Sequence, residues 1–156
     1  LLNGRGISIK YSRTTDTYLS LEERARLANA WGADLFVSIH ANSATSSVRG
    51  TECYTHPTAN TATKTLSGNV SRAIASKFGI SNRGHKEANF AVLRLSNMPA
   101  ILVETAFISN SSDANLLNTR QSDFANAIFN EIYNYFGNPV TNISLINELA
   151  SLAVRY

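Results

Sequence analysis

The sequence is poor in cysteine, in charge and in long apolar runs, and each shortage excludes a class of protein. Cys53 is the one cysteine in 156 residues, so the chain forms neither an internal disulfide framework nor a zinc ribbon of two cysteine pairs. Charged residues make up 16% and hydrophobic residues 44% of the chain, which excludes the composition of a disordered protein. No apolar run approaches the roughly 18 residues of a membrane-spanning helix. The length fits one globular domain with a core of its own.

The chain is mildly basic, with a net charge of +3 and a pI of about 9.2. Its lysines and arginines are spread along the sequence instead of gathering in one stripe, which argues against a nucleic-acid binder. A weakly basic surface suits an anionic polymer such as a cell wall. The scarcity of cysteine is compatible with an exported bacterial protein. The chain shows no initiating Met and no charged start followed by an apolar segment, so we expect a signal peptide to be absent or removed.

Strand and helix signals alternate along the chain. The strand-like or apolar runs lie at residues 7–11, 34–40, 51–55, 90–93 and 100–103. The helical patterns run from Ser20 to near Gly32, over 60–78, after the cap at 110–113, and through Phe124 to Gly137. This alternation predicts a single α/β domain with a mixed, largely parallel sheet flanked by helices. We expect the domain to cover 1–137, followed by a linker or terminal helix at 138–156.

Few side chains remain for chemistry once common motifs are searched for. The sequence has three histidines, no H-E-x-x-H helix, no G-x-S-x-G elbow and no phosphate-binding glycine loop. Cys53 lies inside a strand-like run, which favours a small buried hydrophobe over a nucleophile. Nucleophilic and phosphate-transfer sites are therefore not indicated.

Two polar residues follow apolar strands directly. His40 ends the run at 34–40, and Glu104 comes straight after the run at 100–103. Because ligand sites of α/β sheets lie at the carboxyl ends of their strands, we expect both side chains to reach one site. An imidazole and a carboxylate make a plausible metal ligand and general base. A histidine that only satisfies a local backbone group remains the alternative for His40.

Several motifs, in the same order along the chain, resemble one family. They are FVSIHAN at 36–42, GTE at 50–52, NRG at 82–84, VLR at 92–94, MPAILVE at 98–104 and FISN at 107–110. With SRTTD at 12–16 and the segment 21–29, the sequence resembles the zinc-dependent N-acetylmuramoyl-L-alanine amidases of the "amidase 3" class, found in bacterial autolysins and phage endolysins. The resemblance runs from about Ile7 to Tyr135.

The resemblance implies a hydrolase that cleaves the amide between N-acetylmuramic acid and the L-alanine of the peptidoglycan stem peptide, with a Zn2+ cofactor. It implies that His40 is a zinc ligand and that Glu104 is the general base. Asn42 and Glu52 fall where the family lines its groove, and structural roles in the loop are the alternative for both. The resemblance favours structural roles for Arg13 and Arg94, and it gives no metal-binding role to His56 or His85.

The family's first zinc-binding histidine and its glutamate ligand belong to a stretch upstream of the first residue here, so we expect an N-terminally incomplete zinc site. The implied partner is peptidoglycan, outside the cell or in the wall of a bacterium, or attacked by a phage-encoded enzyme. We expect no nucleic-acid partner and no membrane span. An amidase-derived domain that binds the wall or a partner without cleaving it is the main alternative. An unrelated metallopeptidase is a third.

Overall fold

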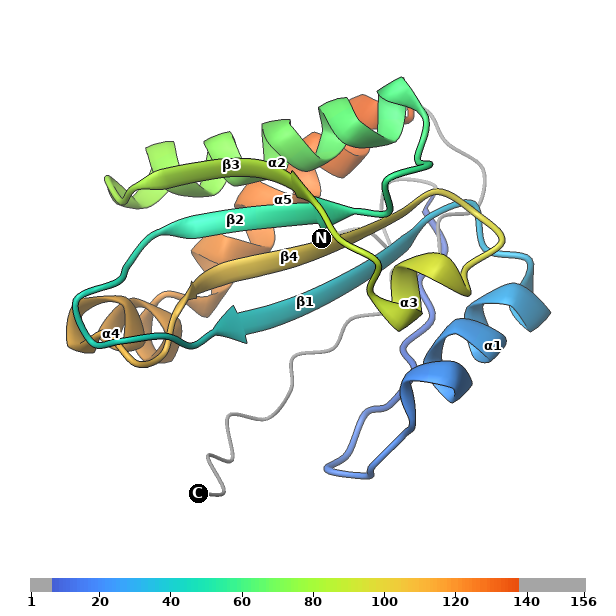
Figure 1. Ribbon diagram of the computed structural model, residues 1–156, viewed down its shortest axis with the longest axis horizontal. Helices are drawn as coiled ribbons and strands as arrows, with labels where there is room; N and C mark the ends of the chain where they lie inside the picture. The colour runs from blue at the N-terminus through green and yellow to red at the C-terminus, as the bar shows by residue number, and fades with distance from the viewer. Residues whose placement is uncertain (1–6, 138–156) are drawn as a thin grey trace.

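A computed structural model describes residues 7–137 of the chain, so the linker or terminal helix expected at 138–156 lies outside the described residues. The helices are α1 (Leu21–Trp31), α2 (Thr61–Phe78), α3 (Ala91–Arg94), α4 (Ser111–Thr119) and α5 (Gln121–Tyr135). The strands are β1 (Phe36–Asn42), β2 (Thr51–Thr55), β3 (Asn82–Glu87) and β4 (Ala100–Phe107). Figure 1 shows these elements as one sheet with helices on its two sides.

The described strands form one sheet in the order β1-β4-β2-β3 (Figure 1). The pairs β1–β4 and β2–β3 are parallel, and the central pair β2–β4 is antiparallel. Parallel strands need a crossover, and α2 supplies one between β2 and β3. The expected fold class, a single α/β domain with a mixed and largely parallel sheet, is confirmed.

Local signals set most helix ends where the sequence predicts them. At the start of α1, the Ser20 hydroxyl accepts a hydrogen bond from the Glu23 amide, and the Glu23 carboxylate accepts one from the Ser20 amide. Gly32 ends α1 in the left-handed region at φ 66°. Asn60 caps α2 and Asn110 caps α4 through side-chain oxygens.

The side chains of the strands alternate between two different surroundings. One face, which includes Val37, Cys53 and Val103, packs against α2 and α5 in the main core. Phe78 of α2 and Phe124 of α5 stack there with ring centroids 4.0 Å apart. Burial raises the pKa of the Cys53 thiol to about 12, which supports its interpretation as a buried hydrophobe.

The other face of the sheet is covered only in part. At the amino ends of β1 and β4, side chains pack in a small second core with α1 and α3; its buried members are Ala28, Phe36, Val92, Leu93, Ala100 and Leu102. Toward the carboxyl ends the same face carries polar side chains instead. No helix within residues 7–137 packs on this part of the face (Figure 1).

One local prediction is wrong, and two elements were not predicted. Residues 7–11 are not a strand: Ile7 is buried and Ile9 half-buried, but no described strand pairs with them. The run at 90–93 is mostly the short helix α3. Strand β3 was not predicted because its sequence, NRGHKE, has no apolar alternation; it lies at the edge of the described sheet and is largely exposed.

No helix within residues 7–137 is long and apolar enough to cross a bilayer.

Candidate active site

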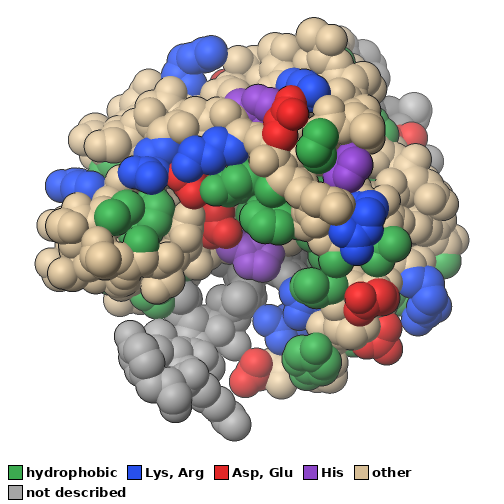
Figure 2. All heavy atoms as spheres, viewed as in Figure 1, with side chains coloured by type: hydrophobic (Ala, Val, Ile, Leu, Met, Phe, Trp, Pro, Cys, Tyr) green, Lys and Arg blue, Asp and Glu red, His purple; other side chains and the backbone are tan. Residues whose placement is uncertain are grey.

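The alternation of three neighbouring strands places polar side chains together on the face of the sheet opposite α2 and α5. His40 of β1 is the register partner of Glu104 of β4, and Glu104 is also the register partner of Glu52 of β2. Glu104 therefore lies between an imidazole and a second carboxylate. Figure 2 shows acidic side chains in the middle of this face, between basic side chains and a histidine.

The sequence placed His40 at the end of its strand. In the structure it lies inside β1, because the strand continues to Asn42 after a register shift. Its Nε2 atom is 2.7 Å from the Ser38 hydroxyl oxygen. Burial, and to a smaller extent the positive charge of Arg24, lower the pKa of His40 to about 4. The imidazole is therefore neutral at pH 7, the form in which histidine binds metal ions.

Glu104 also lies within its strand, which continues through Phe107 instead of ending before the glutamate. The Oε2 atom of Glu104 is buried and has no hydrogen-bond partner among the described residues. Burial first, and then the negative charge of Glu52, raise the pKa of Glu104 to about 7. A carboxyl group with this pKa binds and releases a proton near neutral pH, as a general base requires.

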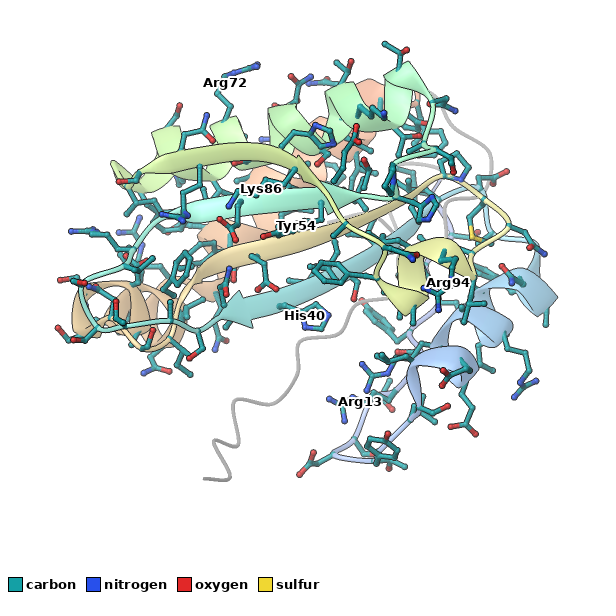
Figure 3. The ribbon with its side chains drawn as sticks, in the orientation of Figure 1. Arg13, His40, Tyr54, Arg72, Lys86 and Arg94 are labelled. Carbon is teal, nitrogen blue, oxygen red and sulfur yellow. The ribbon has the colours of Figure 1, made fainter. Side chains whose placement is uncertain are left out.

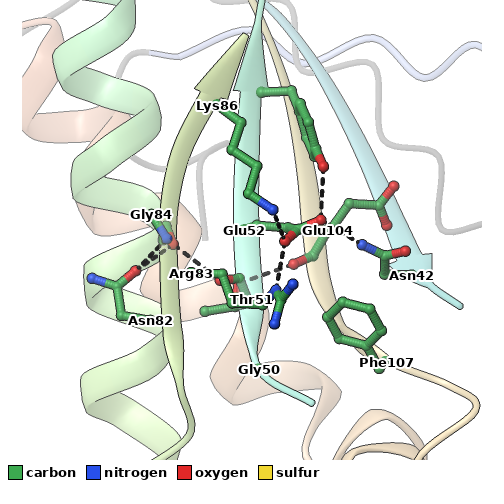
Figure 4. A network of polar contacts seen from close by, with 12 residues as sticks. Asn42, Gly50, Thr51, Glu52, Asn82, Arg83, Gly84, Lys86, Glu104 and Phe107 are labelled. Atoms are coloured by element: carbon green, nitrogen blue, oxygen red, sulfur yellow. Dashed lines mark hydrogen bonds and ion pairs between the residues drawn. The ribbon is translucent and has the colours of Figure 1, made fainter. Parts of the chain in front are cut away.

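Glu52 has the opposite surroundings, although its side chain is only 4% exposed. Its Oε1 atom accepts hydrogen bonds from Asn42 Nδ2 at 2.8 Å and the Tyr54 hydroxyl at 2.7 Å. Its Oε2 atom accepts from Arg83 Nε at 2.7 Å and Lys86 Nζ at 2.5 Å (Figure 4). Burial raises the pKa of Glu52, but these bonds outweigh it and lower the pKa to about 2.

The predicted residues thus fall into two groups. His40, Asn42, Glu52 and Glu104 come together on one face of the sheet. Of the others, Arg13 donates to the Thr17 carbonyl, Arg94 donates to the Asn89 carbonyl, and the His56 ring contacts Thr58. The His85 ring on β3 contacts Thr55 of the neighbouring strand β2. In Figure 3, Arg13 and Arg94 lie at the end of this face that is nearest to α1 and α3, and His40 lies at β1.

Tyr54 and Lys86, for which the sequence predicted no role, complete the surroundings of Glu52. Tyr54 was within reach of prediction, because alternation along a strand puts residues 52 and 54 on the same face. Lys86 was not, because nothing in its segment indicated a strand. Figure 3 shows both on the face of the sheet that bears His40.

The described residues fit one part of a catalytic zinc site and do not complete it. His40 offers a neutral imidazole, and the Oε2 atom of Glu104 is a buried acceptor without a partner. Catalytic zinc takes about three protein ligands and an open position. No group of three or more His, Cys, Asp or Glu side chains within residues 7–137 is arranged to hold a metal ion.

A neutral imidazole opposite a carboxyl group of raised pKa, on the open part of an α/β sheet, is an arrangement typical of metal-assisted hydrolases. The chain belongs to the amidase 3 family of N-acetylmuramoyl-L-alanine amidases, whose profile matches residues 1–134. This confirms the resemblance drawn from the motifs.

Curated relatives agree with this assignment. The chain is 45% identical over 116 residues to the sporulation-specific N-acetylmuramoyl-L-alanine amidase of Bacillus subtilis, covering 73% of this chain and 44% of that protein. It is 40% identical over 127 residues to the endolysin of Bacillus phage SPP1, covering 78% of this chain and 46% of the endolysin. The chain therefore spans less than half the length of these two relatives.

The fold is also that of a solved relative. The crystal structure of N-acetylmuramoyl-L-alanine amidase from Clostridium difficile 630 superposes with a TM-score of 0.77 at 38% identity. The superposition covers 81% of this chain and 70% of that one.

Proposed function

We propose that residues 1–137 are the amidase domain of a zinc-dependent enzyme that hydrolyses the amide between N-acetylmuramic acid and the L-alanine of peptidoglycan. One observation carries the proposal: Glu104 is the register partner of His40, and its buried Oε2 atom has no hydrogen-bond partner within residues 7–137. The names of the sporulation amidase and of the phage endolysin support the substrate class. The site of action is then the bacterial wall, reached from outside the cell or by a phage-encoded lysin, with no nucleic-acid partner.

In this reaction His40 would help to hold zinc, and Glu104 would be the general base. Bound zinc would supply polarisation of the amide carbonyl and activation of the attacking water. Glu104 accepts a proton from the attacking water and returns it to the departing alanine nitrogen. Its raised pKa suits both transfers, because the group is near half-ionised at neutral pH. Asn42 donates a hydrogen bond to Glu52, the register partner of Glu104, so both would contact the substrate beside the general base.

The experiment uses purified sacculi, added zinc and a protein in which this domain carries a full set of zinc ligands. The amidase reaction releases stem peptides that begin with a free L-alanine amine, identified by mass spectrometry. Peptides cut within the stem would indicate a peptidase instead. Chelation of zinc should stop the release, and return of zinc should restore it.

A second candidate function is binding of the wall without cleavage. It is favoured by the absence, within residues 7–137, of a three-ligand metal cluster. Sedimentation of the protein with sacculi, without release of any stem peptide in the presence of zinc, would establish this function in place of hydrolysis.

A further inference from the structure

Arg83 and Lys86 are a pair of half-exposed cations next to Glu104. Both extend from β3 and donate to the same Oε2 atom of Glu52. Their side chains are 38% and 37% exposed, whereas that of Glu52 is 4% exposed. Two positive charges thus surround one buried negative charge, which leaves a net charge of +1 on the solvent side of this group of three residues.

The donors of this pair are only partly used. Arg83 donates through Nε, and its two Nη atoms make no hydrogen bond to any described residue. The Phe107 ring lies 5.2 Å from the guanidinium carbon and fixes the orientation of the group (Figure 4). Lys86 has three N–H donors, of which the bond to Glu52 uses one. A guanidinium with a free pair of Nη donors matches a carboxylate in a bidentate geometry.

The distance from Glu104 to these cations fits a short length of peptide. Strands β4, β2 and β3 are neighbours in that order, so two strand spacings, roughly 10 Å, separate β4 from β3. An extended peptide advances about 3.3 Å per residue. A peptide that lies across β2, with its first amide at Glu104, therefore brings its second or third residue to the cations.

We propose that Arg83, with Lys86 beside it, binds a carboxylate of the stem peptide two or three residues beyond the scissile amide. The site then selects stem peptides whose carboxylate is free over those in which it is amidated. This inference rests on the proposed function, because it takes the muramoyl peptide as the substrate. It adds a specificity-determining residue on β3 to the catalytic pair on β1 and β4.

The test is a comparison of two ligands, N-acetylmuramoyl-L-alanyl-D-glutamate and its diamide, by calorimetric titration of the 156-residue chain. A chelator is present so that neither ligand is cleaved. The free acid should bind roughly tenfold more tightly than the diamide, the effect of one charge-assisted hydrogen-bond pair at a half-exposed site. Arg83→Gln should reduce this ratio to about one, mainly by weakening the binding of the acid.

Two variants control for charge and folding. Arg72→Gln removes an exposed arginine on α2, whose side chain contacts Asn69, and should leave the ratio unchanged. Arg83→Lys keeps the positive charge but loses the paired Nη donors of the guanidinium, so it should keep only part of the preference for the free acid. Thermal melts identify any variant that has not folded.

Equal affinity of the wild-type chain for acid and diamide would overturn the inference, and so would a preference that survives Arg83→Gln. Failure of both ligands to bind would overturn it too. None of these outcomes decides the proposed function, which depends on the release of stem peptides from sacculi. Conversely, a clear preference for the acid without any release would keep the carboxylate site and reject the hydrolase.

Discussion

Glu52 and Glu104 occupy paired positions on the antiparallel strands β2 and β4, but their carboxyl groups have opposite surroundings. Glu52 accepts four hydrogen bonds, two of them from cations, and its pKa falls to about 2. Glu104 has a buried oxygen without a partner among the described residues, and its pKa rises to about 7. In the proposed reaction, Glu52 would stay ionised while Glu104 takes up and releases the proton.

The first prediction concerns turnover. Glu104→Gln keeps the size of the side chain but removes its ability to take a proton, so the release of stem peptides should fall by about 10²–10⁴-fold. Bound zinc, measured by atomic absorption, should stay at the wild-type level. Glu22→Gln is the matched control, because Glu22 is exposed in the first turn of α1 and should have normal activity. Near-normal turnover of Glu104→Gln would remove Glu104 from the mechanism.

The second prediction concerns stability and pH. The pKa of Glu104 is about 7 in the folded chain and 4.5 in a free side chain, so ionisation opposes folding. Below pH 4.5 the Glu104 carboxyl group is protonated in both the folded and the unfolded chain. As the pH rises from 4.5 to 7 the folded chain loses stability relative to the unfolded chain. Glu104→Gln should abolish this loss, which is on the order of 2–3 kcal/mol.

Urea unfolding of wild type and variant, each at pH 4.5 and at pH 8 with a chelator, measures the effect. The difference between the two proteins isolates Glu104, because other titrating groups, including His40, are common to both. A difference in unfolding free energy that is the same at both pH values would show that Glu104 has an ordinary pKa.

The third prediction has the reverse sign. The pKa of Glu52 is lowered to about 2 from 4.5, so its ionised form stabilises the folded chain above pH 4.5. That contribution disappears as the pH falls from 4.5 toward 2. Glu52→Gln should therefore be less stable than wild type at neutral pH, and the two should converge in acid. Parallel stability curves for the two proteins over this pH range would contradict the prediction.

The fourth prediction concerns zinc. In a protein with a full set of zinc ligands, His40→Ala should sharply weaken zinc binding, because loss of one of about three protein ligands leaves an incomplete site. Competition with a fluorescent zinc chelator measures the affinity. His56→Ala is the control, since His56 is half-buried beyond β2 and contacts Thr58. Stoichiometric zinc retained at wild-type affinity by His40→Ala would make His40 a structural histidine.

Most of the fold could be predicted because its signals are local. The capping residues Ser20, Asn60 and Asn110 act on amides within three residues, and apolar periodicity identifies the helices they begin. His40 and Glu104 could be found because each follows an apolar run. Their surroundings could not, because the pKa of Glu104 depends on burial and on a charge from another strand.

The long-range hydrogen-bond partners of Glu52 could not be predicted for the same reason. Two of the four partners of Glu52, Arg83 and Lys86, come from β3, more than thirty residues away, and β3 has no apolar pattern. Edge strands that face solvent carry polar residues on both faces, so alternation does not reveal them. Such a strand is recognisable only once its neighbour in the sheet is known.

Asp113 is a case in which a local prediction missed a long-range role, and it provides the last prediction. The sequence places it in a helix cap, but in the structure Asn110 is the cap and Asp113 is fully buried. Its Oδ2 atom accepts hydrogen bonds from the amides of Gly50, at 2.8 Å, and Phe107, at 3.1 Å. Asp113 therefore ties the start of β2 to the end of β4, which helps to set Glu52 opposite Glu104.

Asp113→Ala should leave both amides buried without an acceptor and lower the free energy of unfolding by about 2–4 kcal/mol. Asp113→Asn should cost less, since its carbonyl oxygen still accepts a hydrogen bond. The control is Asp34→Ala, at an exposed position before β1, which should stay within about 0.5 kcal/mol of wild type. Urea unfolding measures all three. If Asp113→Ala matches the control, the amides of Gly50 and Phe107 find other acceptors, and the carboxylate does not hold the two strands together.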